Sequence, residues 1–187
     1  MKSDLKAKFL QHLISKKKEG GFTLIELLVV IIIIGILSAI ALPSFLNQAA
    51  KGRQTEAKTY VGTLNRTQQG YYAENGLFAG DLASMSQPVP NATTNYGYST
   101  AAVKGANASA INQGVPTTNA GAVSGYVGGV FLVSNVGANS EANTSAILCG
   151  TNAPQAANTA IAAGDTPKLD PATSTAICQG ATAVVRK

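Results

Sequence analysis

The sequence predicts an α+β fold in which one long N-terminal helix packs under a small antiparallel sheet. Residues 22–46 form an apolar run whose only formal charge is Glu26, and residues 47–76 continue it with apolar side chains at helical spacing. Residues 77–187 are rich in Ala, Gly, Thr, Asn and Ser and contain short runs typical of strands. We therefore expect a leader at residues 1–21, an apolar helix, its amphipathic continuation, and a globular head.

The formal charge of +5 belongs mainly to the leader. Residues 1–21 hold six lysines against Asp4 and Glu19, which leaves a net charge of +1 for the rest of the chain. This nearly neutral remainder gives no argument for a direct nucleic-acid site. Because lysines 16–18 precede the apolar run, the positive-inside rule places the N-terminus in the cytoplasm and the head outside. Residues 4–18 themselves either form a short amphipathic helix or remain an unstructured leader.

The apolar run is long enough to span a membrane. At a rise of ~1.5 Å per residue it crosses a hydrocarbon core of ~30 Å. A carboxylate within such a segment has a large desolvation cost, so we expect Glu26 to have a functional role. Gly35 and Pro43 interrupt the run, and each permits a kink or a local opening in a membrane helix.

The second part of the helix is expected to hold the head. The side chains that recur at helical spacing are Ala49, Ala50, Ala57, Tyr60, Val61, Leu64, Gln68 and Tyr71. The charged side chains expected on the other faces are Lys51, Arg53, Glu56, Lys58 and Arg66. Gly76 follows Glu74 and Asn75 as a helix stop that can adopt the left-handed conformation. We expect the helix to bury Tyr60, Val61, Leu64 and Tyr71 against Val130 and Leu132.

The head is expected to contain short strands separated by loops. The predicted strands are residues 96–103, 126–134, 146–149, 173–178 and 181–186. The predicted loops are residues 77–95, 104–125 and 153–171, which are rich in Pro, Gly, Asn and Ser.

Two cysteines, Cys149 and Cys178, lie in the C-terminal part of the head. In an oxidising compartment such a pair predicts a disulfide that closes a C-terminal loop, whereas in the cytosol both would be free thiols. The membrane-spanning run exports everything after it, which favours the disulfide.

The segment Gly21-Phe22-Thr23-Leu24-Ile25-Glu26-Leu27 resembles the processing and assembly motif of type IV pilins. The chain that follows, through Ala41-Leu42-Pro43 and Tyr71-Tyr72, is similar to major pilins of the cyanobacterial kind. The resemblance covers residues 20–78 and beyond them extends only to the general layout.

This resemblance implies how the chain is processed and assembled. A prepilin peptidase and N-methyltransferase would cut between Gly21 and Phe22, remove the leader and methylate Phe22. Glu26 of one subunit would then pair with the Phe22 amine of a neighbour, with help from Thr23, and so set the register of a helical homopolymer. The stretch from Gly35 to Pro43 would be the segment that melts during assembly.

The resemblance also implies location and partners. The precursor would be a single-pass protein of the inner membrane, and the assembled subunit would be part of an extracellular pilus. Its partners would be copies of itself, the inner-membrane assembly machinery and minor pilins. Motility, adhesion and DNA uptake are functions of the family.

Several alternatives remain open. Ser38-Ala39-Ile40-Ala41 faintly matches a secretory cleavage site, which would yield a soluble secreted protein. The chain would otherwise be a pseudopilin of type II secretion, a minor pilin, or a monomeric signal-anchored domain that binds a surface ligand.

The residue inventory does not favour an enzyme. His12 is the only histidine and lies in the leader. The acidic residues of the head, including Glu141, Asp165 and Asp170, lack metal-ligand spacing and are expected to be solvated loop charges. We therefore predict neither a catalytic residue, a metal nor a cofactor.

Overall fold

The computed structural model describes Lys8, Gln11 and residues 21–86, 88–104, 108–117, 123–133, 143–155, 157–170, 173–180 and 182–185. These fall into two compact units, Met1–Phe45 and Leu46–Lys187, and helix α2 (Leu24–Asn75) contributes to both. The amphipathic helix expected at residues 4–18 lies largely outside the described residues.

The first unit contains the apolar part of α2. The helix is continuous through Gly35 and Pro43. Its large apolar side chains from Phe22 to Leu46 are between 44% and 80% exposed, so they are not covered by the residues that the structure describes. An apolar surface of this extent marks a site of contact with a membrane or another protein. Within the described residues, α2 is the one helix long and apolar enough to cross a membrane.

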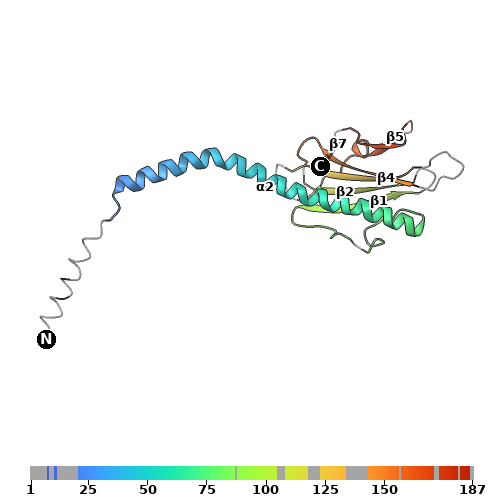
Figure 1. The fold of residues 1–187 in the computed structure, drawn as a ribbon, viewed down its shortest axis with the longest axis horizontal. Helices are drawn as coiled ribbons and strands as arrows, with labels where there is room; N and C mark the ends of the chain where they lie inside the picture. Colours follow the sequence, from blue (N-terminus) through green and yellow to red (C-terminus); the bar gives the residue numbers. More distant parts are fainter. Residues whose placement is uncertain are drawn as a thin grey trace. The chain divides into compact units, whose positions relative to one another are not determined.

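The second unit is the head, in which the later part of α2 lies along an antiparallel sheet (Figure 1). The five strands of this sheet, in spatial order, are β1 (Tyr96–Val103), β2 (Ser109–Pro116), β3 (Tyr126–Val133), β4 (Asn143–Thr151) and β7 (Thr182–Val184). A second, two-stranded sheet pairs β5 (Lys168–Asp170) with β6 (Thr175–Ile177), and a 3₁₀ turn, η1 (Ala163–Asp165), precedes it. Helix α2 ends where Gly76 adopts a φ of 68°, as expected for a glycine stop.

The head contains more strand than its sequence predicts. The predicted loop at residues 104–125 was wrong because it contains β2, and the predicted loop at 153–171 contains η1 and β5. Strand β2 has Asn, Gln, Gly and Pro among its residues, which have low β-propensity. Its strand conformation depends on backbone pairing with β1 on one side and β3 on the other.

The core between α2 and the sheet is built around tyrosines and aliphatic side chains. Its buried members are Ala50, Ala57, Val61, Leu64, Ala79, Leu82, Met85, Val89, Tyr96, Tyr98, Val123 and Tyr126, with Tyr60 and Tyr71 packed against them. The expected partners Val130 and Leu132 were wrong for this core. They form a separate cluster with Phe78, Ala110 and Tyr72, because Phe78 returns to the sheet just after the helix ends.

The opposite face of the sheet is covered by the C-terminal segment. Val127, Cys149 and Ile161 are buried there, and the disulfide between Cys149 and Cys178 joins β4 to this layer with a Cα–Cα distance of 5.9 Å. The predicted disulfide is therefore confirmed.

Polar side chains of α2 form hydrogen bonds directly with the sheet. The Asn65 amide donates to the Ile147 carbonyl oxygen at 2.9 Å and accepts from the Asn112 amide at 2.8 Å. A Cβ atom added at Gly128 would collide with the Asn65 side chain. Glycine at position 128 therefore makes room for this buried hydrogen-bonded pair.

We predict that Gly128→Ala destabilises the head by about 1–3 kcal/mol, since Asn65 cannot move without losing its hydrogen bonds. Chemical denaturation of the full chain in detergent, followed by circular dichroism, measures the effect. Gly52→Ala is the control: this exposed helical glycine has open space at its Cβ position and should leave stability unchanged or raised. Equal stabilities for the wild type and Gly128→Ala would contradict the packing argument.

Candidate assembly site

The start of helix α2 forms a reciprocal capping box. Thr23 is the residue before the helix, and its hydroxyl accepts from the Glu26 backbone N–H at 3.3 Å. The Glu26 carboxylate accepts in return from the Thr23 backbone N–H and from the Thr23 hydroxyl, both at 2.8 Å. These contacts satisfy backbone donors that the first turn of a helix leaves without partners. The structure thus brings the two predicted residues, Thr23 and Glu26, into direct contact.

The carboxylate keeps one oxygen available. Both hydrogen bonds from Thr23 end on Glu26 Oε2, and no described residue donates to Oε1. The Glu26 side chain is exposed, as are its apolar neighbours on the helix. A donor from outside the chain can therefore reach Oε1 without breaking the capping box.

The predicted cleavage bond precedes the helix. Gly21 and Phe22 are non-helical and exposed, and the Phe22 side chain is 80% exposed. Apart from its two neighbours in the chain, no described residue has an atom within 4 Å of the position of a Cβ at Gly21. The backbone at this bond is accessible from outside the chain.

A second polar site, which was not among the predicted sites, lies in the head around Glu56. Its carboxylate accepts hydrogen bonds from the Thr93 hydroxyl, from the Asn95 amide at 2.7 Å and from the Tyr98 hydroxyl at 3.3 Å. The prediction that Glu56 lies on an outer face of the helix was therefore wrong. One signal was present: Glu56 is one helical turn before Tyr60, a member of the face that packs on the head.

Lys58 was also expected on an outer face and contacts the head instead. Its ammonium nitrogen lies 5.6 Å from the centre of the Tyr126 ring, which is within the range of a cation–π contact. Arg66 is exposed, as predicted.

Three buried tyrosines of the head, Tyr96, Tyr98 and Tyr126, have raised pKa values. Burial raises the pKa of Tyr98, and the nearby negative charge of Glu56 and the hydrogen bond to it raise it further. Burial is also the main cause that raises the pKa of Tyr96 and the cause that raises that of Tyr126. The Tyr96 hydroxyl donates to the Ser124 carbonyl oxygen at 2.9 Å, and the Tyr126 hydroxyl donates to Gln54 Oε1 at 3.2 Å.

Metal-ligating side chains are not gathered in the part of the chain that the structure describes: no three His, Cys, Asp or Glu residues there are close enough to hold an ion. Asp165 and Asp170 belong to η1 and β5, and Glu141 lies outside the described residues.

Comparison with known proteins identifies the family. Residues 54–178 match the family of type IV pilin-like G and H proteins, and residues 16–42 match the prokaryotic N-terminal methylation motif. The first match covers most of the head and more than half of the chain, so the chain belongs to the type IV pilin-like family.

Individual relatives are pilins and fimbrial proteins. The chain is 40% identical over 88 residues to the type IV major pilin protein PilA of Myxococcus xanthus, a match that covers 47% of this chain and 40% of PilA. It is 42% identical over 69 residues to the fimbrial protein EcpC of Eikenella corrodens, covering 37% and 45% of the two chains. It is 38% identical over 66 residues to the type IV major pilin protein PilE of Neisseria gonorrhoeae, covering 35% and 40%. The chain thus spans less than half the length of these three relatives.

We predict that the head loses stability at alkaline pH. Tyrosines in the unfolded chain ionise near pH ~10, whereas the buried tyrosines 96, 98 and 126 resist ionisation in the folded head. These tyrosines therefore contribute fully to the stability of the folded head below the pKa of an unfolded tyrosine. That contribution is lost as the pH rises above this value toward the higher pKa of the folded state. Thermal melts of the full chain in detergent should show a falling Tm between neutral pH and about pH 11. Tyr98→Phe should make that fall shallower, and a Tm independent of pH would contradict the argument.

Proposed function

We propose that this chain is the precursor of a pilus subunit and that its mature form polymerises into an extracellular filament. The carrying observation is the continuous apolar surface of α2, which no described part of the chain covers and which carries one carboxylate at its start. In the precursor a membrane covers this surface, and in the filament the same segment of other copies covers it. The likeness to major pilins and fimbrial proteins supports this proposal.

Processing would begin at the exposed bond between Gly21 and Phe22. A prepilin peptidase needs close access to the backbone, and glycine offers no side chain to obstruct it. Cleavage there removes the basic leader, residues 1–21, and leaves a new α-amino group on Phe22, which the same enzyme would methylate. The match of residues 16–42 to the methylation motif supports this step.

Glu26 would then set the register of assembly. The Phe22 ammonium of one subunit would donate to the free Oε1 of Glu26 in a neighbour, while Oε2 stays with Thr23. Because an unpaired charge in a low-dielectric core is heavily penalised, a neighbouring helix that slid out of register would leave both charges without partners. The capping box would fix the carboxylate in position before the neighbour arrives.

Gly35 and Pro43 would allow α2 to open locally during assembly. Pro43 contributes no backbone N–H, so one helical hydrogen bond is already missing there. The free subunit would keep the helix intact, as described above, and the assembled subunit would exchange part of it for extended chain.

The precursor would sit in the inner membrane with its N-terminus in the cytoplasm. The inner-membrane assembly machinery would add subunits to the pilus, and minor pilins would be further partners. Adhesion, surface motility and DNA uptake would be functions of the filament as a whole.

The proposal predicts the terminus of the mature chain. Protein sheared from the cell surface should begin at N-methylated Phe22, as measured by intact mass and N-terminal sequencing. The same terminus found only in membranes would indicate a pseudopilin or a minor pilin. A chain that starts after Ala41, or that retains Met1, would reject the proposed processing.

Three substitutions separate the charge of Glu26 from its capping role. Glu26→Gln keeps an acceptor for Thr23 but removes the charge, and Thr23→Ala removes the two hydroxyl contacts of the capping box but keeps the backbone contact and the charge. We predict that Glu26→Gln and Glu26→Val are cleaved normally but form few filaments, whereas Thr23→Ala loses about 0.5–2 kcal/mol of helix stability and still assembles. Filaments are counted by electron microscopy of sheared fractions from cells without a wild-type copy. Normal filaments from Glu26→Gln would reject the register argument.

A further inference from the structure

The head carries a groove between α2 and strand β4. Its volume is about 670 Å³, and we call it the cationic groove. It is lined on the helix side by Lys58, Thr59, Gly62, Asn65, Arg66 and Gln69, and on the other side by Ala146, Ile147, Leu148 and Val185. The groove is open because Gly62 has no side chain to fill it. Its wall on the β4 side is apolar, and its two charged lining residues are both cations.

Arg66 is the cation that is available to a partner. Lys58 is held over the Tyr126 ring, whereas Arg66 is exposed and no carboxylate of the described residues pairs with it. A guanidinium group presents several donors in a fixed planar arrangement that matches a carboxylate. The chemistry of the groove therefore fits a carboxylate flanked by apolar surface.

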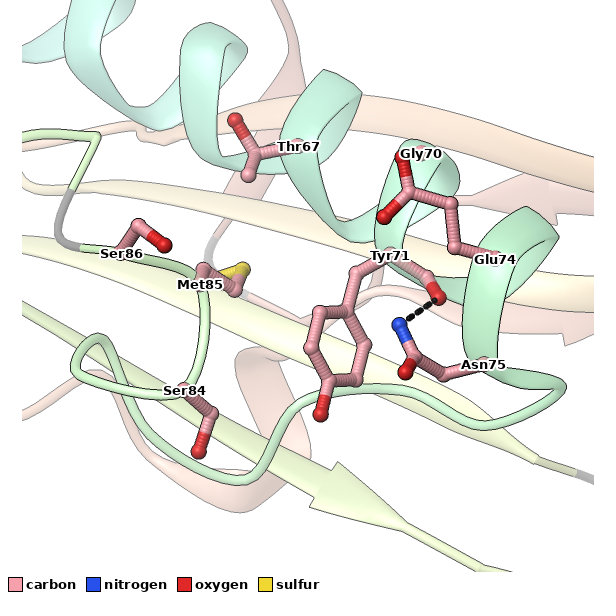
Figure 2. Close-up of a pocket in the computed structure, with 8 residues that line it drawn as sticks. All are labelled: Thr67, Gly70, Tyr71, Glu74, Asn75, Ser84, Met85 and Ser86. Carbon is pink, nitrogen blue, oxygen red and sulfur yellow. Dashed lines mark hydrogen bonds between the residues drawn. The ribbon is translucent and has the colours of Figure 1, made fainter.

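The chain carries an exposed carboxylate near the end of α2, in a hollow where Tyr71 and Met85 supply the larger apolar surfaces among mostly polar residues. Figure 2 shows a hollow between the last turns of α2 and residues Ser84–Ser86, with Glu74 and Tyr71 on its helix side. Its volume is about 270 Å³, and Glu74 supplies the one charged side chain among the described residues that line it. We call this hollow the acidic hollow. Glu74 is exposed, and it forms no hydrogen bond with another described residue that lines the acidic hollow.

A second carboxylate lies beside the acidic hollow. Asp81 accepts from the Ser84 backbone N–H at 2.7 Å and from the Ser84 hydroxyl at 2.8 Å, and these bonds lower the pKa of Asp81. The side of the head near the hollow therefore keeps its negative charge at neutral pH.

The two surfaces cannot meet within one chain. Arg66 and Glu74 are eight residues apart, which is ~12 Å along a helix, beyond the reach of an ion pair between them. At ~100° per residue their side chains also point in directions ~80° apart around the helix axis. Two complementary patches at separate places on one molecule can meet between copies in a head-to-tail contact, and repetition of such a contact generates an open helical filament where its rotation does not close a ring.

We propose that the cationic groove of one subunit receives the edge of the acidic hollow of the next, with Arg66 paired to Glu74. This inference rests on the proposed function, because it requires copies that lie parallel and are shifted along the helix axis. Complementary charges of this kind set the register of neighbouring copies and exclude wrong partners.

Charge reversal tests the contact in cells that lack the wild-type chain. Arg66→Glu and Glu74→Arg should each weaken subunit association roughly tenfold and reduce the yield of sedimented filaments accordingly. The double variant restores opposite charges between copies and should recover the wild-type yield. Lys168→Glu, the same charge change at an exposed residue of β5, is the control and should leave the yield unchanged. A double variant as poor as the single variants would overturn the proposal.

A cross-link gives a readout that does not depend on yield. Filaments of the variant Arg66→Cys with Glu74→Cys should form a ladder of linked subunits with a thiol-specific bifunctional cross-linker whose spacer replaces the lost length of the two side chains, because a direct disulfide requires the two Cα atoms to lie closer than an Arg–Glu pair places them. Lys168→Cys with Glu74→Cys should give no ladder. Wild-type filaments combined with no ladder from the first pair would reject the groove contact alone. Absence of filaments from the wild type would instead reject the proposed function.

Discussion

The head depends on the burial of polar side chains from α2 against backbone groups of the sheet and the connecting loop. Gln68 is fully buried: its amide donates to the Ala79 carbonyl oxygen at 2.8 Å, and its carbonyl accepts from the Ala79 N–H at 2.9 Å. Leaving such a group without its partners costs about 1–3 kcal/mol. Asn65 is bound in the same way to Ile147 and Asn112. A helix rotated or shifted on the sheet would lose all these bonds. Apolar packing therefore holds α2 against the sheet, and the buried amides determine the position of α2 along it.

One helix thus carries two kinds of surface. Its later part finds its partners within the chain, in the tyrosine-rich core and in the contacts of Glu56 with Thr93, Asn95 and Tyr98. Among the residues placed by the structure, its first part has no such partners apart from the capping contacts between Thr23 and Glu26. An apolar surface without internal partners must be covered from outside, which is why the fold points to a membrane and then to other copies rather than to a soluble monomer.

The sequence predicted secondary structure best where a residue type recurs at regular spacing or where a single residue has a strong conformational preference. Strand β1 lies where its alternating tyrosines predict it, and the helix ends at Asn75 because Gly76 follows. The sequence was least informative for β2, whose Asn112, Gly114 and Pro116 argue against a strand. These residues are buried because the helix lies close above them: Val61 packs over Gly114, and Asn65 bonds to Asn112. Val130 and Leu132 were assigned to the wrong cluster because a strand pattern gives the face of a side chain but not its position along the helix.

By itself the sequence determined the family, the long helix, the single carboxylate at its start and the pairing of the two cysteines. Those features depend on composition, on local hydrogen bonding and on spacing within one segment, which the linear chain already contains. Tertiary structure alone decided that Glu56 is a partner of the head, that the C-terminal segment covers the far face of the sheet, and that Arg66 and Glu74 border two separate hollows. These depend on which residues distant in the chain lie together, and that is set by side-chain volumes and by the need to satisfy every buried polar group at once.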